Sequence, residues 1–384
     1  MIYSSPWIDE ELSILQSHVE RFLQREIVPD REKWEEQGFV DRTAWLKAGD
    51  AGLLCASVPE QYGGGGGHRG HEAVIIQEMG RAGVAGGFGA GNMVSSCIVA
   101  HYILGYGSEA QKRRWLPAMA KGEIVGAIAM SEPGAGSDLQ GVSTSARKVD
   151  GGYIVNGQKT WITNGQCADL VIVVAKTDPT AGSKGISLIA VEPEVANGFK
   201  RGKRLSKLGM HAQDTSELFF DDVFVPDDNL LGGEPGRGFV QLMQQLAWER
   251  MQIALTATVA MESAVALTID YVKQRKLFGQ QLLEFQNTQF KLAECKTQAV
   301  VARRFVDTLM VDLMAGSLEP ETAAMAKLWT TETHGRVVDE CLQLFGGFGY
   351  VTEYPIARLY ADARVMRIFG GASEIMKLII SRTL

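Results

Sequence analysis

The chain has 384 residues, of which 46% are hydrophobic and 22% charged, and its formal net charge is −7. This length exceeds what one hydrophobic core usually serves, so we expect two or three domains. The negative charge argues against a general nucleic-acid binder, which needs a cationic face, and no uninterrupted apolar run approaches the roughly 20 residues that a membrane span requires.

The start of the chain carries acids at positions 9–11. A leading segment of this kind is unlike a signal peptide or a mitochondrial transit peptide, so we expect a cytoplasmic protein. Ser5 followed by Pro6, with the acids in the next turns, is the pattern of a helix start. We therefore predict a helix with Ser5 as its N-cap.

Residues 1–125 are predicted to form an all-helical domain. Apolar side chains recur there at helical spacing, as in Leu12, Leu15, Val19 and Phe22. The five cysteines of the chain are scattered without any ligand spacing, and we interpret them as free thiols. The one close histidine pair, His68 and His71, has no cysteine beside it, so no metal site is expected.

From residue 126 to 235 the apolar period changes from 3.6 to 2. Asn156-Gly157 lies between β-forming residues and predicts a hairpin, and Asp150-Gly151 marks another turn. Further strands are predicted at 170–174, 186–191 and 218–220. No helix-length pattern separates most of them, which favours a small antiparallel sandwich or barrel.

Residues 236–384 return to helical periodicity. One stripe steps by three and four residues over four repeats, as expected for a helix in a long bundle. Its members are Phe285, Thr288, Leu292, Cys295, Ala299, Ala302, Val306, Leu309 and Leu313. The predicted fold class is thus α+β, with a helical domain, an antiparallel β domain and a helical bundle.

Glu249 is an acid within an otherwise apolar helical stretch, next to Trp248 and close to Met251. Burying a carboxylate there is costly, but it is also how a protein raises the pKa of a carboxyl and makes it a base. An acid followed by an arginine, here Arg250, is more commonly a solvated or structural pair. The segment alone leaves both interpretations open.

Three other segments have the residues of a cofactor site. Residues 129–138 combine glycines and hydroxyls whose backbone N–H groups could approach an anion or a polar ring edge. Trp161 and Thr163 share one face of a strand and could stack on a planar group and bond its edge. Gly346 and Gly347 interrupt a helix, which indicates a close backbone approach. For each segment alone, a surface loop or core packing is the simpler interpretation.

Together these segments resemble the acyl-CoA dehydrogenase family. The matching motifs are, in order, Ser-Glu-Pro-Gly-Ala-Gly-Ser-Asp at 131–138, Asn-Gly-Gln-Lys-Thr-Trp-Ile-Thr-Asn-Gly at 156–165, Arg-Lys-Leu-Phe-Gly at 275–279 and Gln-Leu-Phe-Gly-Gly at 343–347. The resemblance extends over nearly the whole chain. It implies a flavoprotein of fatty acid metabolism, with FAD as cofactor and β-oxidation as its setting.

The resemblance also implies roles for individual residues. Those that would hold FAD are Ser131, Ser137, Trp161, Thr163, Arg275, Phe278, Gln286, Gln343, Gly347, Ala372 and Glu374. Those that would contact the acyl-CoA substrate are Ser137, Arg250, Gly370 and Gly371. Arg275, Phe278, Gln286, Gln343 and Gly347 match positions that hold the FAD of a neighbouring subunit, so a homo-oligomer is implied, as a tetramer built from two dimers.

The family's catalytic carboxylate occurs at one of two places. In many members it lies in a C-terminal loop, where this chain has Gly370. In the long-chain and isovaleryl branch it comes from a helix, as an acid followed by arginine, which Glu249 and Arg250 match. The resemblance therefore implies that Glu249 removes the substrate's α-proton, with Glu374 as the competing candidate. Ala372 departs from the family, because it replaces a threonine whose hydroxyl contacts FAD.

Several functions remain open at this stage. The leading hypothesis is dehydrogenation of an acyl-CoA to the trans-2-enoyl-CoA, with electrons passing to electron-transfer flavoprotein. An acyl-CoA oxidase, a flavin monooxygenase and an acyl-carrier-protein dehydrogenase share the fold. A non-enzymatic DNA-binding member is a further alternative, which the acidic balance disfavours. Acyl chain length and branching are not predicted.

Overall fold

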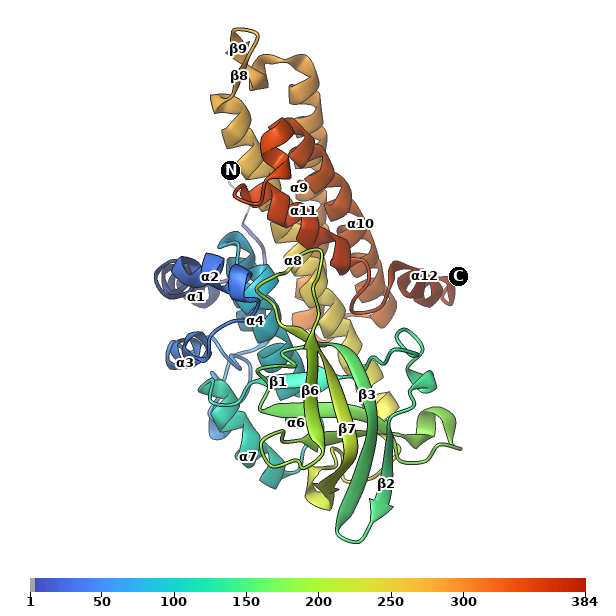
Figure 1. Ribbon diagram of the computed structural model, residues 1–384. Helices are drawn as coiled ribbons and strands as arrows, with labels where there is room; N and C mark the ends of the chain where they lie inside the picture. Colours follow the sequence, from blue (N-terminus) through green and yellow to red (C-terminus); the bar gives the residue numbers. More distant parts are fainter. Residues whose placement is uncertain (1–3) are drawn as a thin grey trace.

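The computed structural model describes residues 4–384 and has three parts in chain order (Figure 1). The first part contains helices α1 (Glu10–Phe22), α2 (Arg31–Gln37), α3 (Arg42–Asp50), α4 (Arg69–Arg81), α5 (Ala90–Val94), α6 (Ala100–Tyr106) and α7 (Glu109–Ala120). The middle part contains strands β1 (Gly126–Ala129), β2 (Ser145–Val149), β3 (Gly152–Thr163), β4 (Leu170–Lys176), β5 (Ile186–Val191), β6 (Phe199–Arg204) and β7 (Thr215–Pro226).

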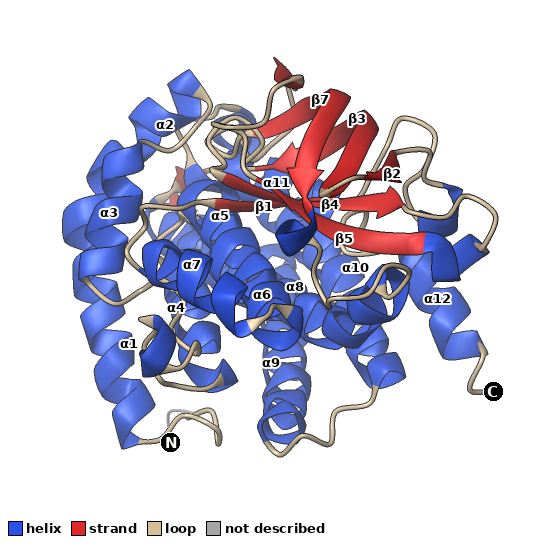
Figure 2. Ribbon diagram, turned by 90° about the horizontal axis from the view of Figure 1, so that it is seen from below, coloured by secondary structure: helices blue, strands red, loops and turns tan. Residues whose placement is uncertain are grey.

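The last part is helical again. It contains α8 (Gly238–Gln274), α9 (Gln286–Met314), α10 (Pro320–Phe345), α11 (Pro355–Met366) and α12 (Ser373–Ser381), with a small hairpin of β8 (Lys276–Leu277) and β9 (Gln280–Gln281) between α8 and α9. In Figure 2 the strands form one layer and most helices lie on one side of it. The predicted α+β fold, helical at both ends with β structure between, is confirmed.

The predicted helix start at Ser5 is wrong. Helix α1 begins directly after Asp9, whose carboxylate accepts a hydrogen bond of 2.9 Å from the backbone N–H of Leu12. Ser5 and the indole N–H of Trp7 donate instead to the carboxylate of Asp307 on α9, at 2.7 and 2.9 Å. A tertiary partner therefore takes the hydroxyl that local sequence assigns to a cap. Residues 1–3 of the predicted N-terminal domain, 1–125, lie outside the described residues.

The sheet is mostly but not wholly antiparallel. Its strand order is β1-β4-β2-β3-β7-β6, with β5 beside β4. Strands β1 and β4 are parallel, and β2 and β4 share one parallel pair, whereas the other pairings within the sheet are antiparallel. The expected antiparallel domain is corrected to a mixed sheet, because β1, which follows the N-terminal helices, pairs with β4 in parallel.

The predicted hairpin at Asn156-Gly157 is also wrong. Both residues lie inside the continuous strand β3, where the pairing with β7 shifts register, and the turn falls only at Asp150-Gly151. A Cβ built on Gly157 would collide with Thr144, so glycine serves a close strand approach there. The Asn156 side chain donates to the Asp222 carboxylate at 2.9 Å across the shift.

Strands β4 and β5 are buried on both faces, which explains their unbroken apolar sequence. On one face Leu170, Ile172 and Val174 pack with α6 and α7 in a single core. On the other face Val171 and Val173 share a second core with apolar side chains of β3 and β7. The first of these two cores therefore attaches helices α6 and α7 to one face of the sheet.

Helix α8 joins the three parts. Its most apolar 18-residue window is long and apolar enough to span a membrane by composition, but 72% of that window is buried inside the protein, as in a core helix. It packs against α4, α9 and α10. The predicted stripe of the next helix is confirmed, because most of its members, from Thr288 to Leu309, are buried along α9.

Candidate active site

Glu249 lies about a third of the way along α8 and is buried. Its exposed fraction is 8%, while Trp248 and Met251 are exposed by 4% and 0%. Helices α4 and α6 cover this part of α8. The acid in the apolar stretch is therefore not a solvated surface residue, and its surroundings decide its chemistry.

One hydroxyl contacts this carboxylate. The hydroxyl of Tyr102, on α6, donates to Oε1 of Glu249 at 3.0 Å, and Tyr102 itself is fully buried. The guanidinium of Arg69, on α4, stacks over the Trp248 ring at 5.1 Å and pairs with Glu72. Both groups come from helices far from Glu249 in sequence.

Burial raises the pKa of Glu249 to about 7. The hydrogen bond from Tyr102 and the positive charges of Arg250 and Arg69 act in the opposite direction and lower it. A carboxyl with a pKa near the operating pH is well matched to general-base catalysis, because it is substantially ionised and still basic. The site thus holds one carboxyl suited to removing a weakly acidic proton.

The raised pKa has a consequence for stability. The folded protein binds a proton at Glu249 more tightly than the unfolded chain, so stability falls as pH rises from about 4.5 through about 7. Glu249→Gln should therefore stabilise the protein above pH 7 by about 3 kcal/mol, and much less below pH 4.5. Denaturant unfolding at about pH 5 and about pH 8 measures this. A stability gain that is the same at both pH values would contradict it.

Arg250, which directly follows this acid on α8, and Lys327 are two buried cations that lie near each other. Arg250 is 5% exposed, and its Nε has no hydrogen-bond partner among the described residues. Lys327, on α10, is fully buried and donates from Nζ to the backbone oxygen of Gly371 at 2.6 Å. Burial is the main cause, and the charge of Arg250 a smaller one, of a pKa of Lys327 lowered to about 8. Lys327 thereby connects α10 to the loop before α12.

That loop places Gly370 next to the acid on α8. Gly370 and Gly371 have φ of 62° and 93°, which favour glycine, and a Cβ on Gly370 would collide with Ile253. Ile253 lies one helical turn after Glu249, so the two places expected for a catalytic acid are neighbours in space. Glu374, the competing candidate, is exposed in the first turn of α12.

Ala372 occupies the N-cap position of α12 and offers no side-chain cap. A threonine there could accept a hydrogen bond from the helix N-terminus. The departure from the expected threonine therefore removes a cap as well as a hydroxyl that could face a cofactor.

A buried ion pair shapes the loop at 130–138. Lys159 is fully buried and donates to Glu132 at 2.9 Å and to the backbone oxygens of Met130 and Val174 at 3.0 and 2.7 Å. The backbone N–H groups of Ser143 and Thr144 also donate to Glu132. This network of hydrogen bonds fixes the start of the loop at Met130 and Glu132, on either side of Ser131.

The protonation of this pair follows from its partners. Burial raises the pKa of Glu132, but hydrogen bonds from Ser143 and Thr144 and the charge of Lys159 outweigh it and lower the pKa to about 2. Burial lowers the pKa of Lys159 to about 8. Glu132 is therefore ionised at neutral pH and holds its donors in place.

Trp161 presents its ring to the outside from a strained strand position. It lies at a register shift of β3 with φ of 57°, and its exposed fraction is 59%. Thr160 and Ile162 are buried, so Trp161 and the half-buried Thr163 lie off the buried face. Strain at an exposed aromatic residue is typical of binding sites.

Ser131 lies beside this tryptophan. The backbone oxygen of Ser131 accepts a hydrogen bond of 3.0 Å from the N–H of Thr160. Ser137 is exposed farther along the same loop, and a Cβ on Gly134 or Gly136 would meet nothing within 4 Å. An exposed indole, hydroxyls and open glycines fit the edge and face of a flavin, so the residues present suit that group.

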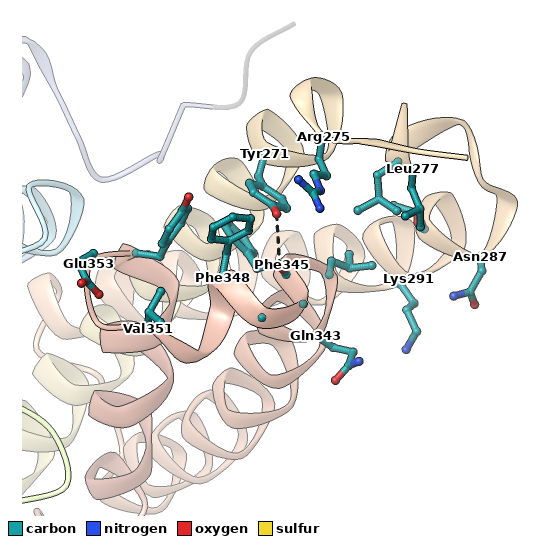
Figure 3. A pocket seen from close by; sticks show the side chains of 16 residues that line it. Tyr271, Arg275, Leu277, Asn287, Lys291, Gln343, Phe345, Phe348, Val351 and Glu353 are labelled. Carbon is teal, nitrogen blue, oxygen red and sulfur yellow. Dashed lines mark hydrogen bonds between the residues drawn. The ribbon is translucent and has the colours of Figure 1, made fainter. Parts of the chain in front are cut away.

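The other predicted cofactor residues lie at the far end of the helical bundle. A cavity of about 960 Å³ there is lined by Arg275, Gln343 and Gly347 (Figure 3). Its floor is aromatic, since Tyr271 stacks on Phe345 at 4.1 Å and donates to the Phe345 backbone oxygen at 3.3 Å. Aromatic faces beside a guanidinium suit a flat, anionic nucleotide.

Phe278 and Gln286 do not line this cavity. Phe278 is at the tip of the β8–β9 hairpin, 90% exposed, with φ of 51°. Gln286 is exposed at the first position of α9. A large apolar side chain that is exposed to solvent on a left-handed backbone costs free energy in an isolated chain.

The two groups of predicted residues are far apart within one chain. Arg275 follows Glu249 by 26 residues, which along α8 is about 39 Å. Figure 1 shows the β8–β9 hairpin at the opposite end of the bundle from the sheet. The structure thus brings together Glu249, Arg250, Gly370 and Gly371, and places Arg275, Gln343 and Gly347 in a second region.

Sequence reasoning missed Tyr102, Lys327, Glu132, Lys159 and Asn164. Asn164, with φ of 63°, donates to the backbone oxygens of Gly91 and Gly126 at 3.0 Å and fixes the end of β3. For Lys327 a signal existed, because a lysine between apolar positions of one helix face is unusual. Tyr102 had no such signal. No group of three metal-ligating side chains occurs within residues 4–384.

The chain matches three family models that follow one another. They are described as the N-terminal, middle and C-terminal domains of acyl-CoA dehydrogenase, and they match residues 9–123, 127–223 and 236–384.

Individual relatives match over nearly the whole length. The mitochondrial long-chain specific acyl-CoA dehydrogenase of Sus scrofa is 47% identical over 97% of this chain and 86% of that protein. The mitochondrial isovaleryl-CoA dehydrogenase of Oryza sativa subsp. japonica is 38% identical over 99% and 93%. The crystal structure of an acyl-CoA dehydrogenase from Geobacillus kaustophilus is 46% identical over 99% of both chains, with a TM-score of 0.95.

Proposed function

The chain belongs to the acyl-CoA dehydrogenase family, and from this premise we propose that it oxidises an acyl-CoA thioester to the trans-2-enoyl-CoA, with Glu249 as the base that removes the α-proton. The observation that carries the proposal is the buried Glu249 carboxyl, whose pKa is raised to about 7. At neutral pH about half of such carboxyls are ionised and ready to accept a proton.

FAD is the cofactor that this proposal requires. When bound, it would accept the hydride equivalent from the β-carbon. Ser131, Trp161 and Thr163 would hold the flavin ring, because an exposed indole and two hydroxyls lie together at the end of β3. Glu132 and Lys159 would keep this loop in shape, since their ion pair holds the backbone on both sides of Ser131.

The distant cavity supports an oligomer. Arg275, Gln343 and Gly347 would bind the adenosine part of the FAD that belongs to a neighbouring chain, since about 39 Å of helix separates them from the base within their own chain. The exposed Phe278 would then be covered at the same contact. A homotetramer, as two dimers, satisfies this arrangement.

The acyl thioester would lie between α8 and the turn before α12. Glu249 would face its α-carbon, and Gly370 and Gly371 would leave room for the thioester, because neither carries a side chain. Arg250 would add positive charge beside the base. Ser137, which is exposed on the loop at 130–138, would contact the CoA part.

Anaerobic mixing of the FAD-loaded protein with acyl thioesters tests this function. A panel of straight and branched acyl-CoAs, with matched acyl-carrier-protein thioesters, should include CoA substrates that bleach the flavin and yield the trans-2-enoyl-CoA. Electron-transfer flavoprotein should then restore the flavin colour. Absence of bleaching with every thioester would overturn the proposal, and stoichiometric hydrogen peroxide in air would assign an oxidase instead.

A further inference from the structure

Helix α6 presents two tyrosines to α8, one helical turn apart. The hydroxyl of Tyr102 donates to Glu249 Oε1 at 3.0 Å. The hydroxyl of Tyr106 contacts the backbone oxygen of Gln241 at 3.2 Å and the side-chain oxygen of Gln244 at 2.9 Å. The two tyrosines therefore join the same pair of helices, but only Tyr102 bonds to the acid.

The bond from Tyr102 has a fixed direction. Burial raises the pKa of Tyr102 well above its ordinary value, so the phenol keeps its proton and acts as the donor. Tyr102 is 0% exposed, so no bulk water competes for its hydroxyl. Among residues 4–384 it is the one hydrogen-bond donor to the Glu249 carboxylate, and it contacts Oε1. The other oxygen, Oε2, receives no bond from these residues.

We propose that Tyr102 is a positioning residue for the base: its hydroxyl holds Oε1 of Glu249 and leaves Oε2 to take the α-proton. The inference rests on the proposed function and assigns a second residue to that site. A carboxylate held by one oxygen loses rotational freedom about its terminal torsion, so its free oxygen stays aimed at the substrate. The bond also stabilises the ionised form, which is the form that can accept a proton.

The other charges around Glu249 are set by different groups. Arg250 comes from α8 itself, Arg69 comes from α4 and is paired with Glu72, and Lys327 comes from α10 and lies near Arg250. Replacing Tyr102 changes none of these charges. The effect of its hydroxyl can therefore be measured separately.

Tyr102→Phe removes the hydroxyl and keeps the ring. A hydrogen bond to a charged group contributes about 1.5–3 kcal/mol. Its loss should therefore raise the pKa of the Glu249 carboxyl by about one to two units. Flavin reduction by acyl-CoA at about pH 6 should then slow roughly 10- to 100-fold and recover at alkaline pH, where Glu249 is ionised again. Tyr106→Phe, the matched control, should leave the pH profile unchanged.

A second measurement does not depend on turnover. The infrared band of the protonated Glu249 carboxyl, identified by its loss in Glu249→Gln, can be titrated in the FAD-loaded protein without substrate. Tyr102→Phe should move this titration to higher pH. Incorporating 3,5-difluorotyrosine at position 102 gives a stronger hydrogen-bond donor and should move it to lower pH, and this variant also serves if the phenylalanine variant does not fold.

An unchanged titration in both variants would overturn the inference, as would a slowing by Tyr102→Phe that is equal at every pH. The proposed function fails separately, by the absence of flavin bleaching in the unaltered protein. The infrared titration would still decide whether Tyr102 controls Glu249.

Discussion

Replacing Glu249 by glutamine is expected to slow the reduction of bound flavin by acyl-CoA by about 100- to 10,000-fold, the usual contribution of a general base. Glutamine keeps the size of the side chain but cannot accept the α-proton. The one hydrogen-bond donor to Glu249 among the described residues is Tyr102, which lies outside the loop at 130–138. FAD should therefore remain bound, which its absorbance and its ratio to protein will show.

Glu374→Gln is the matched control for this experiment. Glu374 is exposed in the first turn of α12 and is expected to contact FAD, not the α-proton, so with FAD in excess its replacement should leave the rate of flavin reduction within a few-fold of the unaltered protein. Normal reduction in Glu249→Gln together with loss of reduction in Glu374→Gln would reverse the assignment of the base.

Lys159→Met is expected to lower the free energy of unfolding by about 3–5 kcal/mol, because it leaves the buried Glu132 carboxylate without its cation. The change also removes two hydrogen bonds to backbone oxygens, one at Met130 next to Ser131 and one at Val174 in β4. FAD should therefore dissociate more easily as well. Denaturant unfolding and FAD titration measure the two effects.

Lys148 provides the comparison within the same sheet. It pairs with Asp227 at the surface, and both side chains are about half exposed. Lys148→Met should cost at most about 1 kcal/mol, since exposed ion pairs contribute little. If the two lysine variants lost equal stability, the buried pair would not have the role assigned to it.

The sequence predicted elements well where a single periodicity decided them. The α9 stripe appears because residues three and four apart share one buried face, and β5 has the predicted bounds of 186–191 because both its faces are buried. Asn156-Gly157 misled, because the preference of that pair for a turn also suits a register shift inside a strand. Ser5 misled because Asp307, on a distant helix, takes its hydroxyl.

The candidate site was predictable only in part. Glu249 is visible as an acid among apolar residues, and family motifs point to Trp161 and Gly370. The pKa of Glu249, however, is raised by its burial and lowered in part by Tyr102 and Arg69, which come from α6 and α4, about 150 and 180 residues earlier in the chain. Long-range contacts of this kind leave no local pattern.

The central claim, that Glu249 removes the α-proton, is tested most directly by proton exchange without oxidation. A 3-thiaacyl-CoA has sulfur in place of C3, so its α-proton can leave but no hydride can follow. In D₂O the FAD-loaded protein should exchange the C2 protons of this compound for deuterium, as followed by NMR, and Glu249→Gln should not. Exchange at an undiminished rate in Glu249→Gln would contradict the account.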